Sequence, residues 1–243
     1  MKAMILAAGL GTRLRPLTDN KPKALVEVGG RTLLEITLSR LRSFGVTEII
    51  VNVHHFAEAM LAYLKERKNF GMRVELSRED LLLDTGGGLK KAGWFFLEDA
   101  GEEPFLLHNV DVISTIDLRQ MVGEHKEAGA LATLAVQERE SSRQLLFDEH
   151  GQLCGRQSGR DSADEIARSS ARPTPLAFSG IHVISPRFLK MMTEEGVFSI
   201  IETYLRLASG GEKIQAFRAD PYYWRDLGRP ESIQQVEQDL ERK

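Results

Sequence analysis

The sequence predicts an α/β protein with a doubly wound, mainly parallel Rossmann-like sheet and a small β-containing elaboration in its second half. Short apolar runs of strand length alternate with stretches of helical spacing through the first half. A glycine-rich loop follows the first apolar run directly, where open α/β sheets bind their ligands. The length of 243 residues suits one large domain of this class.

Composition excludes several classes of function. Hydrophobic residues make up 42% of the chain and charged residues 28%, and the formal net charge is −3, which indicates neither a nucleic-acid nor a lipid partner. The one cysteine, Cys154, excludes a disulfide framework and a cysteine-rich zinc site. No apolar run approaches the roughly 20 residues of a membrane span, and the first apolar stretch is too short for a signal peptide. We therefore expect a cytoplasmic protein.

The first half predicts alternating strands and helices. In the first helix, Leu34, Leu38 and Leu41 share one face, and Gly45 is a suitable stop. The expected strands are residues 3–8, 48–54, 72–76, 104–107 and 131–136, and the expected helices are residues 33–44, 57–67 and 89–97.

The second half has a different pattern. Residues 145–155 predict a hairpin with its turn at His150-Gly151. Residues 156–175 are polar and lack periodicity, which indicates a functional loop. A strand at 176–184 and helices at 185–192, 200–208 and 230–240 complete the expected order.

The loop after the first strand carries the sharpest signal. Gly9 and Gly11 are separated by one residue, an arrangement that lets backbone N–H groups close on phosphate oxygens. A dinucleotide fingerprint would need a third small residue where Leu14 stands, and a helix beginning at once. Pro16 and Pro22 prevent that helix, so a dehydrogenase is excluded.

Basic residues crowd the same loop. Arg13, Arg15, Lys21 and Lys23 place four cations close to the glycines. Arginine can clamp a phosphate with two parallel N–H bonds, and lysine acts as a mobile point charge. The loop therefore predicts a phosphate-binding site, with a solvated basic turn as the alternative.

The stretch from Leu6 to Thr18, with Pro22-Lys23 after it, resembles the signature of the sugar-phosphate nucleotidyltransferases, or NDP-sugar pyrophosphorylases. The resemblance implies the nucleotide-diphospho-sugar transferase fold, with a nucleotide-binding half at about 1–112 and a sugar-binding half at about 113–243. It also implies the reaction NTP + sugar 1-phosphate → NDP-sugar + pyrophosphate, run with Mg²⁺. Arg13 would hold the departing pyrophosphate, and Lys23 would contact the reacting phosphates. The residues of this loop implied to bind nucleotide are Leu6, Ala7, Ala8, Gly9, Gly11, Thr12, Arg13 and Lys23.

Two carboxylates are candidates for holding the metal. Asp111 follows an apolar strand, where an aspartate can bind Mg²⁺ with substrate oxygens or can simply form a turn. The resemblance implies the metal role, although Val110 stands where many relatives have Gly or Ala. Trp224-x-Asp226-x-Gly228 resembles the late motif of the family and implies Asp226 as the second ligand. The implied catalytic set is therefore Arg13, Lys23, Asp111 and Asp226.

Base and sugar contacts are implied by three further segments. Three glycines from Gly86 open a predicted helix and form either a base-binding surface or a plain flexible turn. The resemblance implies base contacts at Thr85, Gly86 and Gly87. The implied sugar contacts are Asn109, Ser179, Gly180 and, as a candidate from the polar loop, Glu165.

The substrate prediction depends on two runs. Residues 83–88 and 176–181 look most like the N-acetylmuramate 1-phosphate uridylyltransferases, so we expect UTP as the donor. A guanylyltransferase that uses GTP with mannose or heptose 1-phosphate is the alternative. A regulatory homologue that binds nucleotide sugars without catalysis would lack one of the four catalytic residues, and all four are present. We also expect a monomer or small homo-oligomer and, without a hexapeptide repeat, no C-terminal β-helix.

Overall fold

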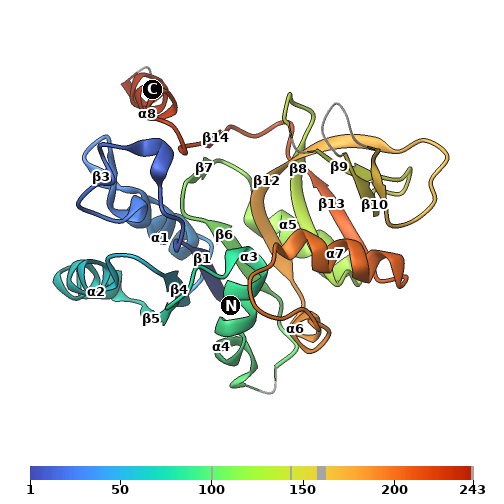
Figure 1. Ribbon diagram of the computed structural model, residues 1–243, viewed down its shortest axis with the longest axis horizontal. Helices are drawn as coiled ribbons and strands as arrows, with labels where there is room; N and C mark the ends of the chain where they lie inside the picture. Colours follow the sequence, from blue (N-terminus) through green and yellow to red (C-terminus); the bar gives the residue numbers. More distant parts are fainter. Residues whose placement is uncertain (100, 143, 158–162, 242–243) are drawn as a thin grey trace.

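The computed structural model describes residues 1–99, 101–142, 144–157 and 163–241. Its centre is a ten-stranded sheet in the order β11-β10-β9-β12-β6-β1-β4-β5, with β8 paired to β12 and β13 paired to β8 (Figure 1). The strands are β1 (Lys2–Leu6), β4 (Glu48–Val53), β5 (Arg73–Arg78), β6 (Phe105–Asn109), β8 (Ala132–Gln137), β9 (Gln144–Phe147), β10 (Leu153–Arg156), β11 (Glu165–Ile166), β12 (Thr174–Ile184) and β13 (Ile214–Arg218).

The first half of the chain forms the parallel part of the sheet. Strand β1 lies between β4 and β6 and runs parallel to both, and β5 extends the same direction beyond β4. Leu6 at the end of β1 is in register with Asn52 on one side and with Asn109 on the other. The three carboxyl ends therefore meet at one edge of the sheet, where open α/β sheets bind ligands.

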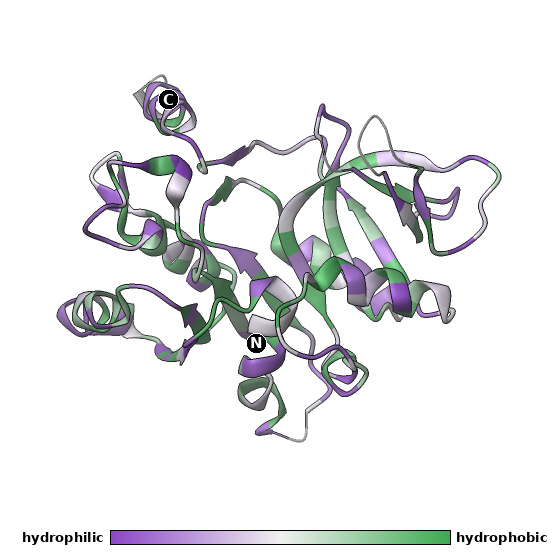
Figure 2. Ribbon diagram, viewed as in Figure 1, coloured by the Kyte–Doolittle hydropathy of each residue, from purple (hydrophilic) through white to green (hydrophobic). Residues whose placement is uncertain are grey.

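Helices cover both faces of the sheet, which confirms the doubly wound prediction. Successive residues of β1 serve opposite faces, because Met4 belongs to one apolar core and Ile5 to the other. Figure 2 shows the apolar residues gathered in the central strands and the polar ones on the outer faces of the helices. Helices α1 (Leu33–Ser43), α2 (Ala57–Glu66) and α5 (Leu118–Ala128) bury side chains in the core of Ile5, and α3 (Asp84–Ala92), α4 (Trp94–Leu97), α6 (Arg187–Lys190) and α7 (Ile200–Ser209) in that of Met4.

The second half adds the antiparallel part. The long strand β12 runs antiparallel to β6, β8 and β9, and its register with β8 shifts between Phe178 and His182. The predicted hairpin is confirmed, since β9 and β10 pair antiparallel around residues 148–151. Part of the predicted 156–175 loop is the short edge strand β11, and residues 158–162 lie outside the described part of the chain.

A small second sheet connects distant parts of the sequence. Strand β7 (Val112–Ser114) pairs antiparallel with β14 (Trp224–Asp226), and Asp226 lies opposite Val112. Helix α8 (Pro230–Glu241) follows and packs on β14 and on the ribbon of β2 (Glu27–Val28) and β3 (Arg31–Thr32). Within the described residues, no helix has the length and apolar character that a membrane crossing requires.

Several elements differ from the sequence prediction, among them strands β2, β3, β7, β13 and β14, which were not predicted. Strand β1 ends at Leu6 rather than at residue 8, because the next N–H, of Ala7, bonds to the side chain of Asn52. The expected helix at 89–97 is two helices, and the first begins earlier and contains the three glycines. Helix α5 was not predicted, although Asp117 caps its first turn and Gly129 in the left-handed conformation ends it.

Candidate active site

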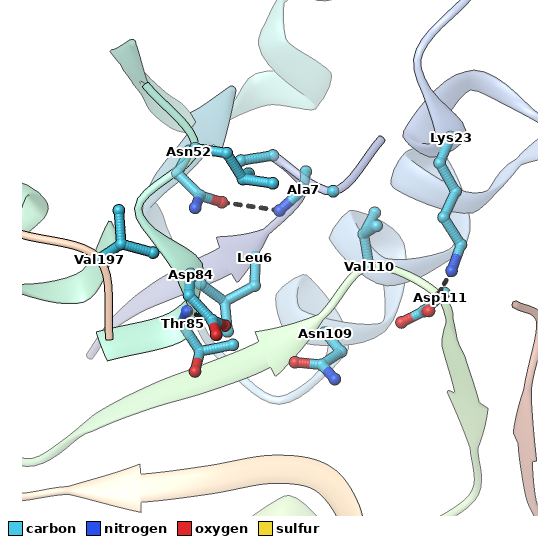
Figure 3. A pocket seen from close by; sticks show the side chains of 13 residues that line it. Leu6, Ala7, Lys23, Asn52, Asp84, Thr85, Asn109, Val110, Asp111 and Val197 are labelled. Carbon is cyan, nitrogen blue, oxygen red and sulfur yellow. Dashed lines mark hydrogen bonds and ion pairs between the residues drawn. The ribbon is translucent and has the colours of Figure 1, made fainter. Parts of the chain in front are cut away.

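A pocket of about 460 Å³ opens at the carboxyl edge of the parallel strands. Figure 3 shows Lys23 and Asp111 on one side of it, Asp84 and Thr85 on the other, and Asn109 between them. The wall is made by Leu6, Ala7, Ala8, Gly9, Lys23, Asn52, Leu82, Asp84, Thr85, Asn109, Val110, Asp111 and Val197. The structure thus brings seven of the residues predicted to bind substrates, and the predicted metal ligand Asp111, to one surface.

Lys23 and Asp111 form the charged end of the pocket. The ammonium group of Lys23 donates to Oδ2 of Asp111, and both side chains are more than four-fifths buried. Lys23 begins a single 3₁₀ turn after Pro22, and Asp111 follows strand β6, so 88 residues separate them in sequence. When a nucleotide and its cation bind, a paired lysine and aspartate of this kind can separate. The lysine then contacts phosphate oxygens, and the aspartate contacts the cation.

Asp226 is brought to the same end by the β7–β14 pairing. The N–H of Leu227 donates to the carbonyl oxygen of Asp111 at 2.8 Å, and Oδ1 of Asp226 accepts from the N–H of Gly228 at 2.8 Å. Gly228 leaves room for this arrangement. A β-carbon there would lie 2.6 Å from Oδ1 of Asp226 and 2.8 Å from Nη2 of Arg13. Arg13 and Asp226 therefore both lie close to Gly228, and neither is among the residues that line the pocket.

The rest of the glycine-rich loop is held by its own contacts. Gly11 has a positive φ of 64°, and its carbonyl accepts from Oγ1 of Thr18 at 2.9 Å. Buried Leu14 anchors the short 3₁₀ turn that contains Thr12 and Arg13, whose side chains stay exposed. Gly11, Thr12 and Arg13 thus lie along the loop beyond the residues that line the pocket.

A buried polar chain supports the opposite wall, and sequence reasoning missed it. Oδ1 of Asn52 accepts from the N–H of Ala7 at 2.7 Å, and Nδ2 of Asn52 donates to Oε1 of Glu79 at 2.8 Å. The other carboxylate oxygen of Glu79 accepts from the N–H of Leu83 at 3.0 Å. These hydrogen bonds connect the glycine-rich loop to the segment of Asp84 and Thr85. Their signal in the sequence is one polar residue, Asn52, inside the apolar run of β4.

The three predicted glycines of α3 are packed beneath the pocket surface. The N–H groups of Gly86 and Gly87 both donate to the carbonyl of Phe198, at 3.0 and 3.3 Å. A β-carbon at Gly86 would lie 2.3 Å from the Phe198 ring, and one at Gly88 2.8 Å from Asn52 and Glu79. The glycines permit this close packing, and the pocket wall here is Asp84 and Thr85.

The predicted sugar contacts separate into two groups. Gly180 has a positive φ of 73° and packs on Asn109. A β-carbon at Gly180 would lie 2.8 Å from the Nδ2 atom of Asn109. Ser179 is fully buried behind it, and its carbonyl accepts from Nε1 of Trp224 at 2.8 Å. Glu165 is different. It lies on the outer edge strand β11 and bonds to Arg156 at 2.7 Å, away from the pocket wall.

Arg139 is a cation near this site that sequence reasoning did not single out. Its guanidinium lies over the Trp224 ring, 3.8 Å from the centroid. Burial lowers the pKa of Arg139, and the nearby Asp226 carboxylate raises it. The sequence does not show that Arg139 stacks on Trp224, because this contact forms only when the β8–β9 connection packs against β14.

Comparison with known proteins identifies relatives for both the sequence and the fold. Residues 2–145 match the family model described as nucleotidyl transferase. The chain is 35% identical over 241 residues to the N-acetylmuramate α-1-phosphate uridylyltransferase of Caulobacter vibrioides, a match that covers 95% of this chain and 93% of that one. It is 30% identical over 235 residues to a probable mannose-1-phosphate guanylyltransferase of Oryza sativa, covering 95% of this chain and 62% of the longer relative.

A similar fold occurs in solved structures. The structure described as a putative glucose-1-phosphate thymidylyltransferase from Bacillus anthracis matches with a TM-score of 0.79. The match covers 98% of this chain and 94% of that one at 18% sequence identity, and at that identity it supports the fold.

Proposed function

The chain belongs to the nucleotidyl transferase family, and from this premise we propose that it makes an NDP-sugar and pyrophosphate from an NTP and a sugar 1-phosphate. The observation that carries the proposal is the pairing of Lys23 with Asp111 in the pocket wall, with the segment after Asp226 bonded to the main chain of Asp111. A base would occupy the other end, beside Asp84 and Thr85. The triphosphate would then run along the main chain of residues 7–9 toward Lys23.

The proposed reaction is one in-line displacement. A phosphate oxygen of the sugar 1-phosphate attacks the α-phosphorus of the NTP, the new P–O bond forms, and the bond to the β-phosphate oxygen breaks to release pyrophosphate. No side chain needs to become covalently attached. Lys23 would neutralise charge on the reacting phosphates, and Arg13 would hold the departing pyrophosphate. Positioning and charge neutralisation of this kind supply most of the rate in phosphoryl-type transfers.

The donor set suits Mg²⁺. Asp111 and Asp226 offer two carboxylates at the charged end, and Mg²⁺ is bound by one or two carboxylates together with substrate phosphate oxygens and water. Within the described residues, no group of three or more His, Cys, Asp or Glu side chains could hold a metal by itself. Asp111 and Asp226 would therefore hold the ion with the nucleotide, and the ion would stabilise charge on the α-phosphate.

UTP and N-acetylmuramate 1-phosphate are the proposed substrates. The supporting observation is that the relative named for this reaction matches at 35% identity over 93% of its own length. GTP with mannose 1-phosphate is the second candidate, because a guanylyltransferase matches at 30% identity. This chain spans only 62% of that second relative.

A pyrophosphate-release assay tests the proposal. Purified protein with Mg²⁺ is given each of four NTPs with N-acetylmuramate, mannose, glucose or heptose 1-phosphate. We expect turnover with UTP and N-acetylmuramate 1-phosphate. Turnover with GTP and mannose 1-phosphate alone would replace the proposed pair by the second candidate. No turnover in any combination, with nucleotide binding retained in calorimetry, would favour a regulatory nucleotide-sugar-binding protein.

A further inference from the structure

Arg139 is held in a fixed position by contacts on two sides. It follows β8 in the connection to β9, and Nη2 of its guanidinium donates to the carbonyl oxygen of Phe178 at 2.8 Å. The flat face of the guanidinium lies on the Trp224 ring at 3.8 Å. Arginine stacks on aromatic rings in this way because its charge is delocalised and weakly hydrated. The side chain is therefore oriented before any ligand arrives.

The stacked Arg139 and Trp224 side chains lie next to the segment of the predicted sugar contacts, because they donate to the carbonyl oxygens of Phe178 and Ser179. Trp224 and Asp226 are two residues apart on β14, so their side chains share one face of that strand. Trp224 is also fixed to β12, because its Nε1 atom donates to the carbonyl oxygen of Ser179. The next residue, Gly180, packs on Asn109, which lines the pocket. These contacts connect Arg139 to Asn109 of the pocket wall, although Arg139 itself is not among the lining residues.

The charge of Arg139 is only partly compensated. Among the described residues, Arg139 has no carboxylate within ion-pair distance, and its buried Nε atom has no hydrogen-bond partner. A guanidinium carries five N–H donors, and a half-buried one costs free energy unless those donors are satisfied. Asp226 is the acidic group whose charge acts on it. Within the described residues Nη2 is the guanidinium nitrogen that donates a hydrogen bond, so the oriented, half-buried cation keeps its Nη1 donors for an oxyanion of the ligand.

We propose that Arg139 is a specificity-determining residue that receives an anionic oxygen group of the sugar substrate. This inference rests on the proposed function. The group is either the carboxylate that an acidic sugar such as N-acetylmuramate carries or the 1-phosphate that every candidate substrate shares. The carboxylate is favoured, because the phosphate has Lys23 available at the charged end of the pocket, whereas Arg139 approaches from the β8–β9 connection on the sugar side.

The test compares Arg139→Gln with wild-type enzyme on two sugars. N-acetylglucosamine 1-phosphate has the ring and acetamide of N-acetylmuramate 1-phosphate but lacks its carboxylate. KM, or the inhibition constant for a sugar that is not turned over, is measured for each, together with KM for UTP. Arg139→Lys keeps the charge but loses the planar stack. Arg187→Gln, which removes a surface arginine paired with Glu212 at 2.9 Å, is the matched control.

We expect Arg139→Gln to raise KM for N-acetylmuramate 1-phosphate about 10- to 100-fold, the loss typical of a charge-assisted hydrogen bond. KM for UTP and the constant for N-acetylglucosamine 1-phosphate should stay within about twofold, and Arg139→Lys should recover part of the loss. An equal increase for both sugars would assign the contact to the 1-phosphate.

Unchanged constants for both sugars would overturn the inference and leave Arg139 as a packing partner of Trp224. The inference would also be overturned if Arg139→Gln lowered the thermal stability and kcat but left KM for N-acetylmuramate 1-phosphate unchanged. The proposed function fails separately, if the wild-type enzyme does not use N-acetylmuramate 1-phosphate. Arg139→Gln is then compared with wild-type on the sugar that is used, where only an increased KM supports the inference.

Discussion

The parallel and antiparallel halves of the molecule contribute to the site in different ways. The parallel half supplies the loop after β1, with Lys23 close behind it, so most of the phosphate end comes from one short stretch of chain. The antiparallel half supplies Gly180, Trp224 and Arg139 from three separate segments, fixed by long-range bonds. If the proposed roles hold, we expect a substitution in one of the three antiparallel segments to change sugar binding without disturbing the phosphate loop.

The largest effect should follow from breaking the charged end. We expect Lys23→Ala and Asp111→Asn each to lower kcat by about 10²- to 10³-fold, the usual loss when one group that stabilises transition-state charge is removed. The loss should be the same for every sugar 1-phosphate, because the proposed function has Lys23 and Asp111 act only on the phosphates and the metal. Steady-state kinetics of pyrophosphate release measures this, with Lys91→Ala on the exposed side of α3 as the control. A loss that depended on the sugar would contradict the division between the two ends.

The next largest effect should come from the buried chain behind the phosphate loop. Asn52→Ala removes the acceptor of the Ala7 N–H and a donor to the Glu79 carboxylate. A buried group left without a partner costs about 1–3 kcal/mol. We expect that loss in the free energy of unfolding, measured with urea, and a higher KM for the NTP.

The matched variant for Asn52→Ala is Thr203→Ala on α7. Its buried hydroxyl lies close to the Glu194 carboxylate, which keeps its two bonds to Arg206, so removal of the hydroxyl leaves no other polar group without a partner. If both variants lost the same stability and kept the same KM for the NTP, the positioning role of Asn52 would be wrong.

Substitution of Gly86 in α3 tests whether this glycine is needed for packing against Phe198 or for contact with a base. Gly86→Ala would force a methyl group to within 2.3 Å of the Phe198 ring and 2.9 Å of its carbonyl. Overpacking of this kind costs about 1–3 kcal/mol. Gly123→Ala on α5 is the control, because nothing lies within 4 Å of its β-carbon and alanine there should stabilise the helix by about 0.5–1 kcal/mol. Opposite signs in urea unfolding are expected, and equal stability of the two variants would exclude the packing role of Gly86.

The fold was predictable where the signal was local. The βα alternation, the β9–β10 hairpin and the start of α8 were read from short patterns, and the structure confirms them. Helix α5 was missed because its apolar residues are few, although Asp117 and Gly129 marked both of its ends. The β7–β14 pair was missed because each strand is three residues long and its partner lies more than 100 residues away.

The site divides in the same way. The first part of the glycine-rich loop, Lys23 and Asp111 line the pocket as the motif indicated, whereas residues 11–13 lie beyond it, and the roles of all these residues remain predictions. Asn52, Glu79 and Arg139 were missed because their importance arises from contacts across the sheet. Glu165 was selected only as an acidic residue in a polar loop, and the structure places it on an outer strand paired with Arg156.

The smallest effect concerns the response of the antiparallel half to acid. His125 bonds to Thr133 and Ser185, and His182 bonds to Tyr204. Burial lowers the pKa of His125 to about 4 and that of His182 to about 3. In the unfolded chain both titrate near about 6.5. Between these values the unfolded state binds protons that the folded state does not, so stability is full above pH 6.5 and is lost as the pH falls.

Each buried histidine should therefore contribute a slope of up to about 1.4 kcal/mol per pH unit below pH 6.5. Urea unfolding between pH 7 and pH 5 measures it, above the range where most carboxylates titrate. His125→Gln and His182→Gln should each make the free energy of unfolding depend less steeply on pH. This expectation holds whether or not they change the stability at pH 7. A slope that survived unchanged in both variants would mean that the acid response has its source elsewhere. The next residue to test would be His108 on β6, because burial lowers its pKa to about 4.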